Sequence, residues 1–300
     1  MTPTDELNAW HTGPSDWQLR ERKVQCLGAH GLHRMAYTEW GDPANTKVLV
    51  CVHGLTRNGR DFDFLARALA SEYRVVCPDV VGRGRSDWLS VKTDYGFPQY
   101  VADMITLIAR LDVDEVHWVG TSMGGIIGML VAAMPDSPIR RLVLNDVGPM
   151  ITLESIQRIA EYVGDAPVFA DKAAAIAYVK SVSAPFGQLS EAQWAHLTEY
   201  AIRPVEGGFT MIYDPGIAEP FRDNPLVENV DLWAVYDTIR CPTLVTRGAE
   251  SDLLLHETAL EMAARGPRAQ LAEIPNVGHA PMLLDEAQIA VVRNFLLADR

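Results

Sequence analysis

Residues 115–134 read EVHWVGTSMGGIIGMLVAAM, and this stretch decides how the rest of the chain is interpreted. A short apolar run, Val116 to Val119, leads into Gly120-Thr121-Ser122-Met123-Gly124, and a long apolar segment of good helix formers follows. The order strand, tight turn, helix is the context that a G-x-S-x-G sequence needs in order to present a nucleophile. A serine in so sharp a turn keeps its backbone conformation only if the residues two before and two after it lack a Cβ. Ser122 is therefore predicted to be a nucleophile at a helix N-terminus.

The G-x-S-x-G string alone is a weak signal. By composition it should occur by chance in about one chain in ten of this length, because glycine and serine are common. The apolar strand before it and the apolar helix after it support the functional interpretation.

The composition is that of a globular enzyme-sized chain. Its 300 residues, 48% of them hydrophobic, suffice for one large core or for a core with an inserted subdomain. No apolar run approaches the roughly 20 residues of a membrane span, and residues 1–24 lack the basic start and apolar region of a secretory signal. We therefore expect a cytoplasmic protein with no membrane partner.

The net charge of −13 disfavours a nucleic-acid partner, because binding to a phosphate backbone depends on clustered Lys and Arg. It says little about a small substrate, although the overall field would not steer a strongly anionic one inward. Oligomeric state cannot be inferred from the sequence.

The cysteines do not form a metal-binding pattern. They lie in or beside apolar runs at wide spacing, with no C-x-x-C, and are predicted to be reduced core residues: Cys26, Cys51, Cys77 and Cys241. His256 follows Asp252 by four residues and could share a metal with it, but no further ligand suggests itself. No metal site is expected.

Apolar periodicity predicts alternating strands and helices. An antiparallel hairpin is predicted at 24–28 and 32–40, and further strands at 47–52, 73–77, 116–119, 139–144, 243–246 and 270–274. Helices are predicted at 61–71, 97–111, 230–239, 256–264 and 281–298. Such alternation indicates parallel βαβ units in a three-layer α/β domain.

The alternation stops between residues 149 and 229, where the pattern is helical and loop-like without strand runs. This segment is predicted to be an insertion into one core formed by residues 1–148 and 230–300. Its aromatic and large apolar residues could line a pocket for an apolar substrate or pack within the insertion: Trp194, Tyr200, Phe209, Met211, Tyr213, Phe221 and, just beyond it, Trp233.

A serine hydroxyl is a poor nucleophile until a base takes its proton, and the base needs a group that holds its tautomer. His279, in Asn276-Val277-Gly278-His279-Ala280, follows the last predicted strand, where a parallel sheet delivers loops to its ligand-binding edge. The other histidines are expected to be packing, loop or solvated residues: His11, His30, His33, His53, His117, His196 and His256.

The acid should follow another strand at the same edge of the sheet. Asp252 does so and gives the order Ser, Asp, His along the chain. Glu250, two residues earlier, and Asp146, which follows the strand at 139–144, remain rivals. The developing oxyanion needs N–H donors; the backbone of Met123 is one candidate, and Leu55, after His53-Gly54, is the other.

These features together resemble the α/β-hydrolase superfamily, in its esterase, lactonase and carbon–carbon hydrolase branch. The matching segments run in family order from residue 24 to residue 298: His53-Gly54-Leu55, Asp79 to Ser86, the elbow Gly120 to Gly124, Gly248 to Asp252, and Gly278 to Pro281. The resemblance implies an eight-stranded, mostly parallel sheet and a helical cap at about 149–229. It also implies Ser122 as nucleophile, Asp252 as acid, His279 as base, and Leu55 and Met123 as oxyanion donors.

Three functions are compatible with this pattern. The leading hypothesis is hydrolysis of a carboxylic ester or lactone of a small, apolar substrate through an acyl-enzyme, without a cofactor. The serine does not match the aspartate-dependent dehalogenases and epoxide hydrolases, and Ala280 stands where carbon–carbon hydrolases usually carry an aromatic residue. Hydrolysis of a carbon–carbon bond in a dienone acid is the second hypothesis, and a ligand-binding role on the same scaffold is the third. No role is assigned to Arg57, Arg83 or Arg85.

Overall fold

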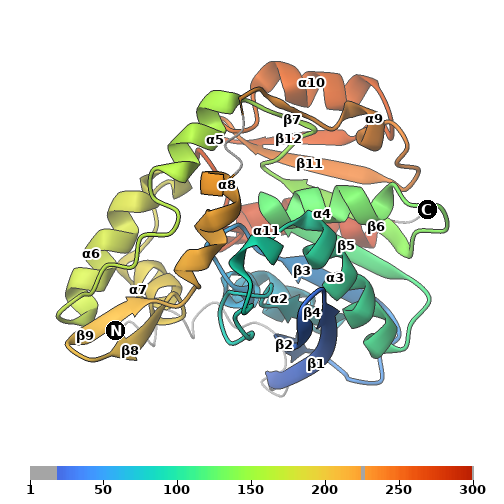
Figure 1. The fold of residues 1–300 in the computed structure, drawn as a ribbon. Helices are drawn as coiled ribbons and strands as arrows, with labels where there is room; N and C mark the ends of the chain where they lie inside the picture. Colours follow the sequence, from blue (N-terminus) through green and yellow to red (C-terminus); the bar gives the residue numbers. More distant parts are fainter. Residues whose placement is uncertain (1–18, 224–226, 299–300) are drawn as a thin grey trace.

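An eight-stranded sheet forms the centre of the computed structural model, which describes residues 19–223 and 227–298 (Figure 1). The strands lie in the order β1-β2-β4-β3-β5-β6-β11-β12. Only the pairs β1–β2 and β2–β4 are antiparallel. This confirms the predicted fold class, a mostly parallel eight-stranded sheet in an α/β domain. The strands are β1 (Arg20–Gly28), β2 (Gly31–Trp40), β3 (Val48–Val52), β4 (Arg74–Pro78), β5 (Val116–Thr121), β6 (Ile139–Asn145), β11 (Thr243–Gly248) and β12 (Gln270–Ile274).

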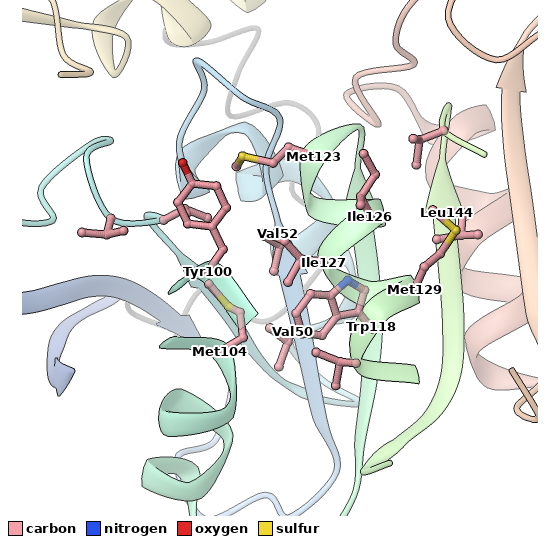
Figure 2. Packing of buried hydrophobic residues seen from close by; sticks show 14 of the residues in the cluster. Val50, Val52, Tyr100, Met104, Trp118, Met123, Ile126, Ile127, Met129 and Leu144 are labelled. Atoms are coloured by element: carbon pink, nitrogen blue, oxygen red, sulfur yellow. The ribbon is translucent and has the colours of Figure 1, made fainter. Parts of the chain in front are cut away.

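Helices cover both faces of the sheet, which is why its central strands are continuous apolar runs. Val50 and Val52 of β3 belong to one hydrophobic cluster, whereas Leu49 and Cys51 belong to the other. The first cluster includes residues of α3 (Phe97–Leu111), α4 (Met123–Ala132) and α10 (His256–Ala264), and the second includes residues of α2 (Asp63–Leu69) and α11 (Glu286–Leu297). Figure 2 shows Ile127 of α4 beside Val50 and Val52.

Most predicted helices of the core occur, but some are shorter than expected. The segment predicted as a helix at 61–71 is a 3₁₀ turn, η1 (Gly59–Phe62), followed by α2. The last helix begins only at Glu286, because the side chain of Asp285 accepts a hydrogen bond from the N–H of Gln288 and so caps the first turn. The segment predicted as a helix at 230–239 contains only the short α9 (Trp233–Tyr236).

The segment between β6 and α9 contains most of the remaining elements. Its base is a two-stranded pairing of β7 (Met150–Ile151) with β10 (Val230–Asp231). The other elements lie together on one side of the sheet (Figure 1): α5 (Leu153–Ala160), α6 (Lys172–Val182), η3 (Ala184–Phe186), α7 (Glu191–Glu199), β8 (Ile202–Val205), β9 (Gly208–Met211), η4 (Pro215–Ala218) and α8 (Glu219–Asp223).

The β8–β9 hairpin contradicts the expectation that this segment has no strands. Gly207 has a φ of +85° and Gly208 a φ of +140°, so both adopt backbone conformations that favour glycine and permit the tight turn. The two strands have four residues each, and runs of that length carry little periodicity of their own.

In residues 19–223 and 227–298, none of the helices has the length and apolarity required to cross a bilayer. The cysteines are free thiols, as predicted; Cys26, Cys51 and Cys77 are buried, and Cys241 is half-buried.

Candidate active site

Ser122 lies in the turn between β5 and α4 with a φ of 52° and a ψ of −118°. Its N–H donates to the carbonyl of Asn145 at 3.1 Å, which ties the turn to the end of the neighbouring strand β6. A Cβ on Gly120 would lie 2.2 Å from the carbonyl oxygen of Gly124, and one on Gly124 would lie 2.0 Å from that of Val52. The backbone contacts therefore require glycine on both sides of this serine, as the sequence pattern predicts.

His279 connects Ser122 to a buried carboxylate. Its Nε2 lies 3.0 Å from Oγ of Ser122, and its Nδ1 lies 2.7 Å from Oδ2 of Asp146. If Nδ1 carries the single ring proton of His279, the serine hydroxyl can donate to Nε2 while Nδ1–H donates to the carboxylate. The imidazole is mostly buried, and the loop that carries it is held by a 2.7 Å hydrogen bond from the N–H of Gly278 to the carbonyl of Pro185.

The carboxylate beside His279 belongs to Asp146 and not to Asp252, which corrects the choice made from the sequence. Asp146 is fully buried, and it also accepts hydrogen bonds from the N–H of Gly248 at 2.8 Å and from Oγ of Ser251 at 2.6 Å. Asp252 has a side chain that is 55% exposed, and it pairs with Arg158 of α5.

The reason for this correction is the direction in which the two side chains point. β6 and β11 are neighbouring strands, and the segments after both of them reach the carboxylate beside His279. The side chain of Asp146 points to His279, whereas that of Asp252 points to Arg158 and solvent, and the segment after β11 supplies only donors to the carboxylate. Glu250, the other rival, has an exposed side chain.

The loop after β3 lies against Ser122, since a Cβ on Gly54 would be 3.6 Å from that of Ser122. His53 is fully buried; its Nδ1 lies 2.7 Å from the carbonyl of Gly54, and its Nε2 accepts from the N–H of Val80 at 2.9 Å. Burial, together with the smaller effect of the charges of Arg83 and Arg57, lowers the pKa of His53 to about 3. The imidazole is thus neutral, with Nδ1–H as the donor to Gly54.

This hydrogen bond orients a candidate oxyanion donor. The carbonyl of Gly54 and the N–H of Leu55 belong to the same planar peptide, so fixing one fixes the direction of the other. The second candidate, the N–H of Met123, lies at the first residue of α4 and has no acceptor within the helix. The roles of both N–H groups remain part of the proposal below.

Arg83 is a site residue that the sequence pattern did not indicate. It lies in the glycine-rich loop after β4, where the default expectation is a solvated side chain, yet it is fully buried. Its Nε donates to the carbonyl of Leu55 at 2.8 Å. The only local signal is the pair of flanking glycines, Gly82 and Gly84, both with positive φ.

The other described histidines have packing or pairing roles. The Nε2 of His33 lies 2.9 Å from Asp103, and the Nδ1 of His117 lies 2.8 Å from the hydroxyl of Tyr73. His196 packs edge-on against Phe64. His30 and His256 pair with Asp94 and Glu273, and His11 lies outside the described residues.

Several of the predicted pocket residues pack against other side chains. Trp194, Met211 and Tyr213 belong to a buried hydrophobic cluster, and Trp194 stacks on Phe186 with ring centres 6.5 Å apart. The ring of Tyr200 lies 3.7 Å from the guanidinium carbon of Arg60. These contacts support the packing interpretation for these residues.

In the described part of the chain, one group combines three buried side chains that could act as metal ligands: Cys26, His33 and Asp103, whose ligand atoms lie within 4.8 Å of one another. The group is held by its own hydrogen bonds, and burial together with Asp103 raises the pKa of the Cys26 thiol to about 12. These residues lie on β1, β2 and α3, none of which carries a residue of the serine centre.

Comparison with known proteins identifies the family of this chain. The model of the alpha/beta hydrolase family matches residues 49–293. A 3-hydroxybutyrate-oligomer hydrolase of Cupriavidus necator is 51% identical over 91% of this chain and 96% of its own length. The crystal structure of an alpha/beta hydrolase from Novosphingobium aromaticivorans is similar with a TM-score of 0.84 and 34% identity, covering 95% of this chain and 99% of that one. An N-formylmaleamate deformylase of Pseudomonas putida is 26% identical over 84% of this chain and 88% of its own length.

Proposed function

Since the chain belongs to the alpha/beta hydrolase family, we propose that it is a serine hydrolase that cleaves carboxylic esters through an acyl-enzyme. The observation that supports this most directly is the hydrogen-bond series from Ser122 through His279 to Asp146, with distances of 3.0 and 2.7 Å. A serine, a base and an orienting carboxylate in this arrangement meet the requirements for nucleophilic catalysis.

In the proposed reaction, Ser122 Oγ attacks the ester carbonyl carbon while His279 Nε2 takes the hydroxyl proton. Asp146 keeps Nδ1 protonated and stabilises the imidazolium that forms. The N–H groups of Leu55 and Met123 bind the oxyanion. Collapse of the tetrahedral intermediate releases the alcohol, which receives the proton from His279. A water molecule, deprotonated by the same imidazole, then hydrolyses the acyl-enzyme and regenerates Ser122.

We further propose that the ester is a short oligomer of 3-hydroxybutyrate. The support is the Cupriavidus necator relative, whose name states this substrate and which is 51% identical over nearly the whole of both chains. Each ester bond in such an oligomer joins the carboxyl group of one unit to the secondary hydroxyl of the next, and one end of the chain carries a free carboxylate. The alternative of carbon–carbon bond hydrolysis has less support, because Ala280 stands directly after His279 and the 51% identical relative is an ester hydrolase.

The test is release of 3-hydroxybutyrate from the dimer and trimer by the wild type and by Ser122→Ala. We expect kcat to fall at least about 10³-fold in the variant, because the nucleophile is lost. Ser90→Ala, which removes an exposed serine hydroxyl, is the matched control and should retain wild-type rates. A folded Ser122→Ala enzyme that retains the wild-type rate would exclude the acyl-enzyme mechanism. Activity on p-nitrophenyl esters without activity on the oligomers would exclude only the proposed substrate.

A further inference from the structure

Arg83 contacts both residues whose N–H groups are the proposed oxyanion donors. Its side chain has a relative exposure of 0%. Its Nε donates to the carbonyl of Leu55 at 2.8 Å, and its Nη2 lies 3.7 Å from Sδ of Met123. One buried guanidinium therefore links the loop after β3 to the first residue of α4.

The remaining contacts of this guanidinium are to neutral groups. Nη1 donates to the carbonyl of Val81 at 2.8 Å and to the hydroxyl of Tyr100 at 3.0 Å. The guanidinium carbon lies 5.0 Å from the ring centre of Tyr100 and 5.7 Å from that of Tyr95. These contacts satisfy most of its donors, but none of them carries a negative charge.

No carboxylate neutralises Arg83 among the residues that the structure describes. Asp79, in the same loop, has Arg85 as its cation, and Asp214, which accepts from the hydroxyl of Tyr95, pairs with Lys92. A buried charge without a counter-ion is costly to fold, because it leaves water and gains no ion pair. Such a charge is free to interact with an anion that forms nearby during function.

The charge acts on the neighbouring loop even in the resting enzyme. Arg83 is one of the two cations that lower the pKa of His53, whose Nδ1 orients the peptide of Leu55. In a buried environment such a field is screened much less than at the surface. A negative charge that develops beside Leu55 and Met123 therefore develops in a positive potential.

We propose that Arg83 is a positioning residue for the oxyanion hole and that its charge stabilises the tetrahedral oxyanion. The inference rests on the proposed serine hydrolase function. Through its bond to the Leu55 carbonyl, the guanidinium fixes the segment that presents the Leu55 N–H. Its charge meets a counter-charge only when the substrate oxygen becomes negative, so the stabilisation is larger in the transition state than in the ground state.

The test compares Arg83→Gln and Arg83→Lys with the wild type on a neutral ester, p-nitrophenyl acetate. Arg83→Gln removes the charge, whereas Arg83→Lys keeps it. We expect kcat to fall about 10- to 100-fold in Arg83→Gln and less in Arg83→Lys, with KM changed less than about 3-fold. Affinity for a boronic acid, which forms a tetrahedral anionic adduct with the serine, should fall in parallel with kcat.

The matched control is Arg85→Gln, in the same loop, because Arg85 is one-third exposed and pairs with Glu21 and Asp79. It should retain wild-type kcat. A loss in Arg83→Gln that appears only in KM, or that leaves boronic acid affinity unchanged, would overturn the proposal and leave Arg83 as a packing residue. Equal losses in the Gln and Lys variants would overturn the electrostatic part.

A second measurement separates failure of this inference from failure of the proposed function. A fluorophosphonate reacts with an activated serine: Oγ displaces fluoride from phosphorus, and the serine proton passes to the histidine. Mass spectrometry identifies the labelled residue without knowledge of the natural substrate. Absence of labelling at Ser122 in the wild type would contradict the proposed function, whereas equal labelling rates in wild type and Arg83→Gln would contradict only the role of Arg83.

Discussion

At the scale of single residues, the contacts of Asp146 predict the effect of its substitution. The carboxylate is fully buried and accepts hydrogen bonds from His279, Gly248 and Ser251. Asp146→Asn can no longer hold the Nδ1–H tautomer of His279, so we expect kcat to fall about 10⁴-fold with little change in KM. Rates on p-nitrophenyl acetate measure the effect.

Asp252→Asn is the matched control for this prediction. Asp252 is exposed and pairs with Arg158, and its backbone carbonyl accepts from Oγ of Ser155 at 2.9 Å. These contacts hold α5 to the loop after β11, and none of them involves Ser122, His279 or Asp146. Its kcat should stay within about 3-fold of wild type. The assignment of Asp146 fails if the two variants lose activity equally, or if only the Asp252 variant does.

His53 carries the second prediction at this scale, through the pH dependence of stability. Its pKa is about 3 in the folded protein, whereas the ordinary pKa of histidine, which applies to the unfolded chain, is 6.5. As pH falls below 6.5, the unfolded chain takes up a proton that the folded protein excludes, so the free energy of unfolding falls, by up to about 1.4 kcal/mol per pH unit. Above pH 6.5 the imidazole is neutral in both states and the effect vanishes.

His53→Asn removes this titration and keeps a side-chain donor for the carbonyl of Gly54. The variant should be less stable than the wild type at pH 7. The difference between their free energies of unfolding should narrow by about 2 kcal/mol between pH 7 and pH 4.5, as measured by urea denaturation. Parallel stability curves over this interval would show that His53 is not held neutral by the fold.

The sequence predicted the contact of Ser122 with His279 because each residue follows a strand in a recognisable local pattern. It could not choose between Asp146 and Asp252, since both residues follow neighbouring strands and only the tertiary contacts of their side chains separate them. Arg83 was missed for a similar reason. A glycine-rich loop is expected at the surface, and only the packing of Tyr95 and Tyr100 around the guanidinium shows that it is buried.

At the scale of elements, the turn from β5 to α4 depends on Gly124, whose absent Cβ leaves room for the carbonyls of Val52 and His53. In Gly124→Ala the new Cβ would lie 2.0 and 2.9 Å from these oxygens, which belong to the backbone and cannot rotate away. We expect a loss of about 2 kcal/mol or more in the free energy of unfolding, together with lower kcat because the Leu55 loop is displaced. Denaturation and ester hydrolysis measure the two effects.

The matched control is Gly96→Ser at the N-cap of α3. Gly96 has extended backbone, and a Cβ there would lie 3.7 Å from Pro98, which is ordinary contact. Serine is a favoured N-cap residue, so stability should be unchanged or slightly higher. If Gly124→Ala were as stable and active as this control, the close approach of β3 to the elbow would be wrong.

The elements predicted best are those with long or strongly apolar patterns. α3, α10 and β12 have the predicted bounds. The predicted helix at 230–239 instead begins with β10, whose strand partner, β7, lies about eighty residues earlier in the chain. Pairing over that separation leaves no local periodicity, as with the short strands of the β8–β9 hairpin.

At the scale of the whole molecule, the segment between β7 and β10 is joined to the rest of the chain by several hydrogen bonds and an ion pair. Pro185 accepts from Gly278, next to His279, and the carbonyl of Tyr200 accepts from the side chain of Asn58. Lys92 of the core loop pairs with Asp214, which is buried. The first two contacts tie this segment to the loops that carry His279 and His53.

The overall charge leads to a prediction that depends on the proposed substrate. The chain has a net charge of −13 and a pI near 5.0, and a 3-hydroxybutyrate oligomer carries a terminal carboxylate. At low ionic strength the enzyme should repel this anion, and salt should screen the repulsion, because the Debye length falls from about 30 Å at 0.01 M to about 8 Å at 0.15 M. We expect kcat/KM for the dimer to rise about 2- to 3-fold over that range.

The methyl ester of the same dimer has no charge and should show no such rise. If kcat/KM for the anionic dimer falls with salt while that for the methyl ester stays constant, a local positive field attracts the substrate more strongly than the overall charge repels it.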